Sequence, residues 1–304
     1  MSAMRFTLVP LLLLFAIAVH ADYREFTEIP VDPRLATQLR QAAEATLKAY
    51  PKLKAEDLAL SAVDLTNPNT IGRADVQGDA PFYPASVIKL CYMIDVFATH
   101  KEHIGDVDRA LHEMISVSDN DATAYLVDIL AGTTPGPPLQ GRALTRYIER
   151  RRAITKRFQR LGYTDSVNAM MKPWSFGPFG RELQALGENR VNRNKLTPNA
   201  TASLLLWIVR RHAPSADAMM TLLERPLAPP RKEENQVSEF IGASLPEGAK
   251  LWSKAGWTSE VRHDAAYIEL PNGRKLVLVI FTRGLADDVT LIPAIAKYLL
   301  TELQ

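Results

Sequence analysis

Ser86 and Lys89 are the residues in this sequence whose types and spacing most directly suggest chemistry. A serine hydroxyl is a weak nucleophile until an adjacent base takes its proton. Residues three apart share one face of a helix, so the lysine amine could lie beside the serine oxygen. The apolar run 87–97 predicts a buried helix that begins near Ser86, with the serine at the positive end of the helix dipole. The alternative is a capping serine followed by a lysine whose stem covers apolar surface.

Two further fragments could complete such a site. The first is Ser118-Asp119-Asn120 and the second is Lys254-Ala255-Gly256. Each is weak alone, and a serine-led fragment of this kind is also typical of a helix N-cap. Lys89 can act as a base only if its pKa falls, which burial and a second cation such as Lys254 would cause.

The order S-x-x-K, S-D-N and K-x-G resembles the class A β-lactamase and penicillin-binding D,D-peptidase superfamily. The resemblance extends from about residue 40 to the C-terminus. It implies an α/β (α+β) fold, with an antiparallel sheet flanked by helices and an inserted all-α domain. The site would lie in the cleft between the two parts.

The resemblance also implies a role for each motif residue. Ser86 would be the acylated nucleophile and Lys89 its base or proton relay. Ser118 would pass a proton to the leaving amine, and Asn120 would hydrogen-bond the substrate amide. Lys254 would line the far wall, near Ser118 and the substrate carboxylate.

The rest of the site is implied in the same way. Gly256 closes the third motif, and the backbone N–H groups of Ser86 and Trp257 would form an oxyanion hole. Glu188 to Asn192 fits the family's E-x-x-L-N loop with Val in place of Leu, so Glu188 would activate the hydrolytic water and Asn192 would help to hold it. A chance match on a surface loop is the alternative, and Glu182 is a weaker candidate for the same role.

The third motif departs from the family pattern. Ala255 stands where the family usually has threonine or serine, so it cannot offer a hydroxyl to a substrate carboxylate. Arg262 could substitute electrostatically, or it could be an exposed arginine at the end of a strand.

Length and composition narrow the class of protein. The chain has 304 residues and a net charge of +2. A net charge this small does not favour binding to nucleic acid. Residues 1–21 read as a cleaved secretory signal, because the apolar stretch is too short to span a membrane and ends at a small-residue site. Cys91 is the single cysteine, so an intramolecular disulfide is excluded, and we expect this thiol to be a core residue.

Hydrophobic periodicity divides the mature chain into a sheet domain, 22–100 with 224–304, and an all-α domain, 101–223. We expect strands and helices at the following ranges. The strands are 58–65, 71–76, 250–254, 264–270 and 275–282, and the helices are 33–50, 107–117, 122–130, 144–161, 200–211, 216–223 and 289–303.

For two other sets of residues, an ordinary structural role is the favoured interpretation. The run 142–160 carries seven arginines and Lys156 at helical spacing, which favours a solvated basic face over an anion-binding patch. His100, His103 and His112 complete no metal signature, so we expect no metal and no cofactor.

The sequence therefore predicts an exported serine hydrolase that acts on β-lactams or related amides through an acyl-enzyme on Ser86. The alternatives are a D-alanyl-D-alanine carboxypeptidase or an esterase with the same serine, and a non-catalytic envelope protein that uses this fold to bind. The expected partner is a small β-lactam or peptidoglycan-type substrate. We expect a periplasmic or secreted monomer without nucleic acid and without a stable membrane anchor.

Overall fold

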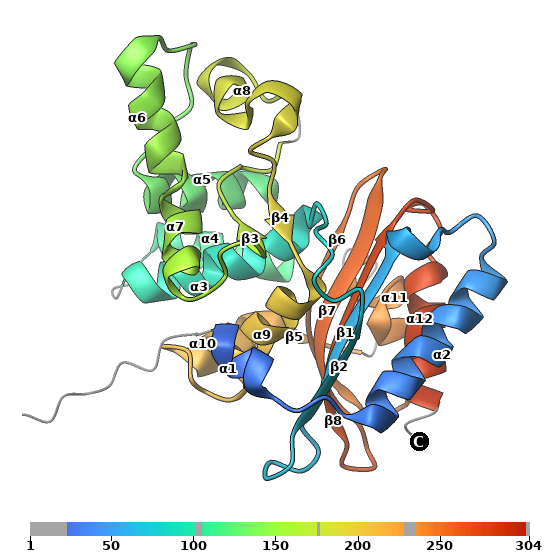
Figure 1. Ribbon diagram of the computed structural model, residues 1–304. Helices are drawn as coiled ribbons and strands as arrows, with labels where there is room; N and C mark the ends of the chain where they lie inside the picture. Colours follow the sequence, from blue (N-terminus) through green and yellow to red (C-terminus); the bar gives the residue numbers. More distant parts are fainter. Residues whose placement is uncertain (1–22, 101–104, 175–176, 228–234, 302–304) are drawn as a thin grey trace, which may run out of the picture.

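A six-stranded antiparallel sheet forms the centre of the molecule (Figure 1). The computed structural model describes residues 23–100, 105–174, 177–227 and 235–301; the predicted signal sequence therefore lies outside the described residues. The strand order β2-β1-β8-β7-β6-β5 places the first hairpin of the chain against its last strand. The bounds are β1 Leu58–Asp64, β2 Gly72–Val76, β5 Glu224–Arg225, β6 Lys250–Trp257, β7 Val261–Glu269 and β8 Lys275–Arg283.

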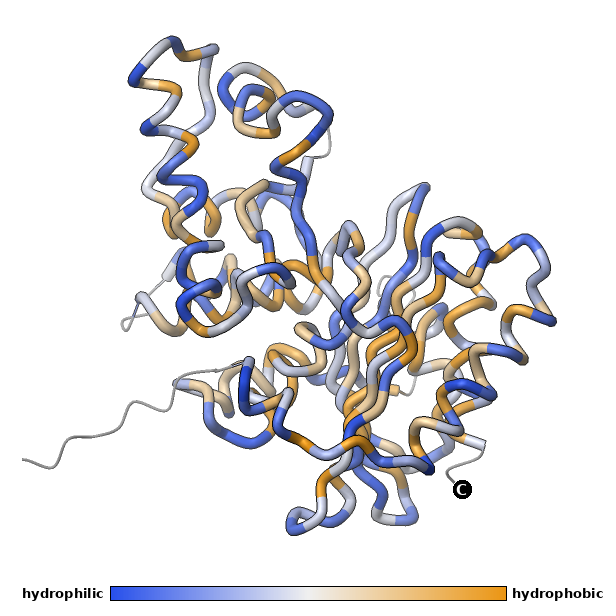
Figure 2. The backbone as a smooth tube through the Cα atoms, in the orientation of Figure 1, coloured by the Kyte–Doolittle hydropathy of each residue, from blue (hydrophilic) through white to orange (hydrophobic). Residues whose placement is uncertain are grey.

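Helices cover both faces of this sheet (Figure 1). The helices α2 (Pro33–Ala49) and α12 (Leu291–Thr301) pack on one face, and α9 (Pro198–Val209) packs on the other. Because neither face meets water, the residues of β7 are buried in succession instead of alternating between buried and exposed. Figure 2 shows the apolar residues concentrated where sheet and helices meet.

Local signals explain where several elements begin or turn. The Asp32 carboxylate caps α2 by accepting from the backbone N–H of Arg34 at 2.8 Å. Thr197 caps α9 by accepting from the N–H of Ala200 at 3.2 Å. Gly273, at a φ of +86°, turns β7 into β8, where a residue with a β-carbon would be strained.

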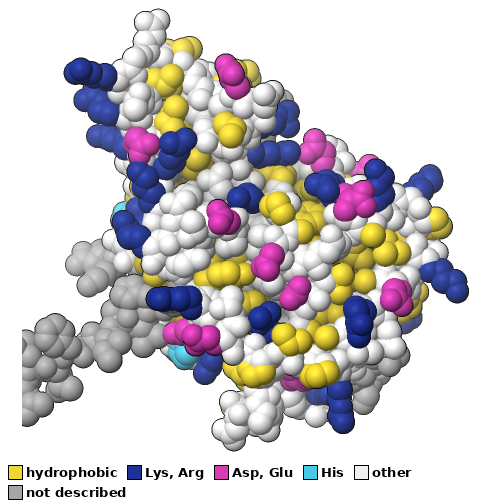
Figure 3. All heavy atoms as spheres, viewed as in Figure 1, with side chains coloured by type: hydrophobic (Ala, Val, Ile, Leu, Met, Phe, Trp, Pro, Cys, Tyr) yellow, Lys and Arg dark blue, Asp and Glu magenta, His cyan; other side chains and the backbone are white. Residues whose placement is uncertain are grey.

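The helices α3 to α8 lie together beside the sheet, with α6 and α8 standing farthest from it, whereas α1, α10 and α11 lie close to the sheet and to α9 (Figure 1). Lys and Arg side chains gather over the edge where α6 and α7 lie (Figure 3). Among the described residues, no helix is long and apolar enough to cross a membrane. The bounds are α1 Tyr23–Glu28, α3 Lys89–Thr99, α4 Asp106–Ser116, α5 Asn120–Ala131, α6 Gly141–Arg151, α7 Ala153–Arg160, α8 Gly180–Leu186, α10 Ala216–Leu223 and α11 Asn235–Ser238, with the two-residue strands β3 Val167–Asn168 and β4 Lys195–Leu196.

A buried cluster of charges ties α6 and α8 to α5. Arg151 is fully buried and donates to Glu182 at 3.0 Å, with Asp128 at 3.5 Å. Lys172 pairs with Asp128 and lies 3.2 Å from Glu182, which also accepts from the Tyr147 hydroxyl at 2.6 Å. Two acids thus balance two bases, and removing one partner would leave a charge buried without compensation.

The sequence-based ranges needed two corrections. The single helix predicted over 144–161 is wrong: it is two helices, α6 and α7, which break at Arg152. The two packing directions differ, because α6 turns Arg151 toward α5 and α8 while α7 turns Arg157 toward Asp95 on α3. The second correction concerns the strands predicted to end at 254 and begin at 264, which continue to Trp257 and start at Val261.

Candidate active site

Ser86 lies in a 3₁₀ turn, Ala85–Ile88, directly before α3. The turn brings Ala85 to a φ of +46°, a left-handed conformation that costs an alanine roughly 1 kcal/mol or more. The neighbours Val87 and Ile88 are buried, whereas Ser86 is half-buried. The packing of this turn holds the serine at the surface of a rigid core.

Lys89 is the first residue of α3, and its side chain is completely buried. Its amine donates to the Ser118 carbonyl at 2.6 Å, to Ser118 Oγ at 3.1 Å and to Asn120 Oδ1 at 3.0 Å. No hydrogen bond joins this amine to Ser86 within the described part of the chain. Burial lowers the pKa of Lys89 to about 7, against the opposing effect of the Asp119 charge.

The three residues of the second motif have separate tasks. Asp119 caps α5 by accepting from the N–H of Ala122 at 2.6 Å. Ser118 has a φ of +63°, and this backbone conformation, together with the Asp119 cap, brings Ser118 and Asn120 to the Lys89 amine. The motif therefore forms a helix cap, and it also brings two polar side chains to the Lys89 amine; the catalytic role of Ser118 stays a prediction.

Lys254 approaches Ser118 from the sheet. It is fully buried on β6, and its amine donates to Ser118 Oγ at 3.0 Å and to the Ala255 carbonyl at 2.8 Å. Burial lowers the pKa of Lys254 well below its usual value, and the positive charges of Lys89 and Arg225 act in the same direction. A hydroxyl has two acceptor lone pairs and one donor, so Ser118 can accept from both amines and still donate its proton to a third group.

Gln236 completes this arrangement and carried no signal in the sequence. It is buried on α11, where its Oε1 accepts from the Lys254 amine and its Nε2 donates to the Ser116 carbonyl at 2.8 Å. Ser116 ends α4, so Gln236 joins the helix that precedes Ser118 to the strand that carries Lys254. Only the folded chain brings these segments together.

Gly256 lets β6 approach the serine turn closely. A β-carbon at this position would lie 2.7 Å from the Ser86 nitrogen and 2.8 Å from the Val87 nitrogen, distances that real β-carbons do not show. Lys254 and Gly256 are two residues apart on a strand and share the face toward the serine. The third motif therefore needs glycine here for steric reasons.

The backbone N–H of Trp257 is directed away from β7. Thr258 N donates to Val261 O at 2.9 Å across the hairpin, and in an antiparallel ladder the next residue along points its N–H the other way. On that edge of β6, β5 pairs with Leu251 and Trp252, at the far end from Trp257. This orientation suits a donor to a substrate oxygen.

Glu188 begins a 3₁₀ turn on the loop after α8, and its side chain is exposed. The structure records no hydrogen bond or ion pair between the Glu188 carboxylate and any described residue. Asn192 fastens the loop instead, because its Nδ2 donates to the Ala185 carbonyl at 2.8 Å. Glu182 is held by Tyr147, Arg151 and Lys172, so its oxygens are already engaged.

The comparisons with known proteins agree with this geometry. Residues 105–303 match the family model Beta-lactamase2, the β-lactamase enzyme family. This chain belongs to the β-lactamase enzyme family. The match includes the second and third motifs and begins after Ser86 and Lys89, so those two residues stand on their own sequence and structure.

Solved β-lactamases and a related protein share the fold. PBP-A is 18% identical over 90% of this chain and 98% of its own, with a TM-score of 0.63. A β-lactamase from Sphaerobacter thermophilus is 21% identical over 87% and 96%, with a TM-score of 0.58, and the TLA-1 extended-spectrum β-lactamase is 16% identical over 88% and 99%, with a TM-score of 0.62. No curated protein matches the sequence. The predicted fold class and superfamily are confirmed, and family membership supports a serine hydrolase activity.

This β-lactamase family member differs from the sequence-based expectation at Arg262. The side chain is buried, not exposed: it pairs with Glu239 at 2.6 Å, donates to the Ala286 carbonyl at 3.1 Å and lies over the Phe240 ring. Ala255 is also fully buried, on the sheet face opposite Lys254. Neither residue is placed to meet a substrate carboxylate.

Two further contacts near the serine turn were not predicted. Arg193 stacks over the Tyr83 ring, 3.6 Å from its centroid, and pairs with Glu260 at 3.1 Å. Asn194 accepts from the N–H of Met171 at 2.8 Å and donates to the Tyr92 hydroxyl at 3.0 Å. Both residues fasten the loop after α8 to the elements that carry Ser86 and β6.

No group of three or more His, Cys, Asp or Glu side chains that could hold a metal occurs in the part of the chain that the structure describes. His100 is next to the end of α3 and His112 is exposed on α4, while His103 lies outside the described residues. Cys91 is fully buried on α3.

Proposed function

We propose that this protein is an exported hydrolase that cleaves β-lactams or related amides through an ester on Ser86. The observation that carries the proposal is the convergence of two buried lysines on Ser118 Oγ, with Gly256 holding β6 against the backbone of Ser86. A binding protein would gain nothing from placing two lysine amines out of water around one hydroxyl, because burying ionisable groups is costly.

In the acylation step, Ser86 Oγ attacks the carbonyl carbon of the substrate amide. Neutral Lys89 takes the serine proton, directly or through a water, when substrate binding brings the groups together. The developing oxyanion accepts from the N–H groups of Ser86 and Trp257. The C–N bond then breaks, and Ser118 gives its proton to the leaving nitrogen while Lys89 restores the Ser118 proton.

Lys254 and Asn120 hold the substrate in this scheme. In its protonated form, Lys254 would attract a substrate carboxylate, which would compensate for the absence of a hydroxyl at Ala255. Asn120, fixed by the Lys89 amine at 3.0 Å, offers its amide N–H₂ to the substrate side chain.

Deacylation requires a water and a base, and we propose Glu188 as the base, with Asn192 fixing its loop. Support comes from the order of the motif along the chain and from the engagement of Glu182 elsewhere. The exposure of Glu188 favours a second candidate function, a penicillin-binding D,D-peptidase that releases β-lactam products slowly.

A fluorescent penicillin separates these functions in one experiment on the mature chain and on Ser86→Ala. A Ser86 adduct that appears and then disappears with turnover supports the β-lactamase. An adduct that persists supports the peptidase. Intact mass spectrometry that finds no adduct, or that finds one in Ser86→Ala, would refute the proposed nucleophile.

A further inference from the structure

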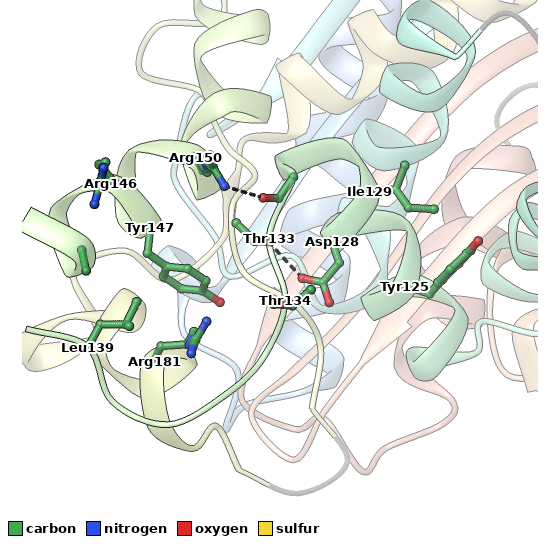
Figure 4. Close-up of a pocket in the computed structure, with 12 residues that line it drawn as sticks. Tyr125, Asp128, Ile129, Thr133, Thr134, Leu139, Arg146, Tyr147, Arg150 and Arg181 are labelled. Atoms are coloured by element: carbon green, nitrogen blue, oxygen red, sulfur yellow. Dashed lines mark hydrogen bonds between the residues drawn. The ribbon is translucent and has the colours of Figure 1, made fainter.

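A cavity of about 650 Å³ lies between α5, α6, α8 and the segment 132–139 (Figure 4). None of its lining residues belongs to the group around Ser86. Its volume is in the range of pockets that hold small ligands. The proposed hydrolase leaves this cavity without a role.

Three guanidinium groups line the cavity. Arg146 and Arg150 lie on α6 with Ala143 and Tyr147, at the spacing that puts residues on one helix face, and Arg181 comes from α8. Arg150 Nη1 donates to the Gly132 carbonyl at 3.2 Å, drawn as a dashed line in Figure 4. Arg181 Nε donates to the Pro137 carbonyl at 3.2 Å. Each guanidinium has five N–H donors, so these contacts fix the groups and leave donors for a ligand.

The positive charge of the cavity is not balanced by acids. No described acidic side chain forms an ion pair with Arg146, Arg150 or Arg181. Asp128 also lines the cavity, but it is already paired with Lys172 and lies near Arg151. On the opposite side of α6, by contrast, Glu149 pairs with both Arg152 and Lys156. Glu149 therefore compensates two of the charges outside the cavity, whereas the three arginines that line it have no acidic partner among the described residues.

Rings and hydroxyls complete the lining. The Arg181 guanidinium lies 5.7 Å from the centre of the Tyr147 ring, and the Tyr147 hydroxyl is fixed by Glu182. Tyr125 is 43% exposed, so its ring can meet a ligand, and Thr134 offers an exposed hydroxyl. Sugar rings present C–H groups to aromatic faces and hydroxyls to such side chains, and arginine binds carboxylates in a bidentate fashion.

We propose that this cavity binds an acidic saccharide, one whose sugar rings carry carboxylate groups. The carboxylates would meet Arg146, Arg150 and Arg181, and a sugar ring would lie against Tyr125, the exposed ring of the lining. The basic run along α6, for which a solvated face was the favoured interpretation of the sequence, would thus have one functional face and one solvated face.

Isothermal titration calorimetry with trigalacturonate, maltotriose and inorganic phosphate tests the proposal on the mature chain. Trigalacturonate should bind, and maltotriose, which has no charge, should not. Arg146→Gln and Arg181→Gln should each weaken binding about tenfold or more, as expected when a hydrogen bond to a charged group is lost. Arg142→Gln removes the same charge from an exposed residue of α6 outside the cavity lining and should change binding less than twofold.

Three results would overturn the proposal. The first is the absence of trigalacturonate binding up to about 10 mM, well above the range of specific ligands. The second is equal weakening by Arg142→Gln, which would indicate attraction by overall charge. The third is phosphate binding as tight as that of trigalacturonate, which would indicate an anion site without saccharide recognition. Circular dichroism of each variant checks that it is folded.

Discussion

The pKa of Lys89 allows a quantitative prediction about the acylation step. Burial lowers this pKa from 10.5 to about 7, so about half of the Lys89 amines are neutral at pH 7. At the unperturbed pKa, roughly one in 3,000 would be neutral at the same pH. Because only the neutral amine can accept the Ser86 proton, the acylation rate should rise with pH and reach half its maximum near pH 7.

Lys89→Arg is the perturbation that isolates this effect. Arginine keeps the positive charge and the hydrogen-bond donors toward Ser118 and Asn120, but it does not lose its proton in proteins. Acylation should fall by about 10²–10⁴-fold, the usual contribution of a positioned base, and its rise through pH 7 should disappear.

The assay is the rate of labelling by a fluorescent penicillin between about pH 5 and pH 9, followed before turnover so that deacylation does not enter. Lys156→Arg, on the exposed side of α7, is the matched control and should behave as the unmodified protein. A labelling rate in the unmodified protein that does not change across this range would refute the assignment of Lys89 as the base. Labelling of Lys89→Arg within a factor of ten of the unmodified protein would also do so.

Three other predictions concern the surroundings of the site. Gln236→Ala should lower the free energy of unfolding by about 1–3 kcal/mol and slow labelling, since Ser116 and Lys254 each lose a buried partner; chemical denaturation and labelling rates measure the two effects. Glu188→Gln should leave labelling unchanged and slow deacylation by about 10²–10⁴-fold; fast steady turnover in pre-steady-state kinetics would mean that another group is the base. Glu182→Ala should cost about 3–5 kcal/mol in denaturation experiments because a buried ion cluster loses an acid, and an unchanged midpoint would contradict the ion-pair cluster.

The sequence was informative where a local pattern has a local cause. The Asn272-Gly273 pair predicted the β7–β8 turn because glycine adopts the positive φ that the turn requires. The β6–β7 hairpin was missed because its loop, Ser259 and Glu260, carries no such signal, and because Gly256 resembles a strand end. That glycine instead serves a contact with Ser86, more than 150 residues away in the sequence, which no local pattern reveals.

At the candidate site, too, local sequence patterns identify residues but do not predict all of their contacts. The motifs singled out Lys89, Ser118 and Lys254, and the fold brings their side chains within hydrogen-bonding distance. The i, i+3 rule placed the Lys89 amine beside Ser86, whereas its recorded hydrogen bonds are to Ser118 and Asn120. Helical spacing fixes where a side chain starts, but a lysine stem is long, and its amine goes to the strongest acceptors that burial leaves within reach.

The role of Gln236 at the site could not be predicted from any sequence motif. A glutamine on a short helix has no distinctive spacing, yet it binds the Lys254 amine and the end of α4 at once. Two buried lysine amines around Ser118 need acceptors for the protons they do not donate to it, since an unsatisfied buried donor is costly. The chemistry of the motif lysines therefore demands such a partner, and only the fold determines which residue supplies it.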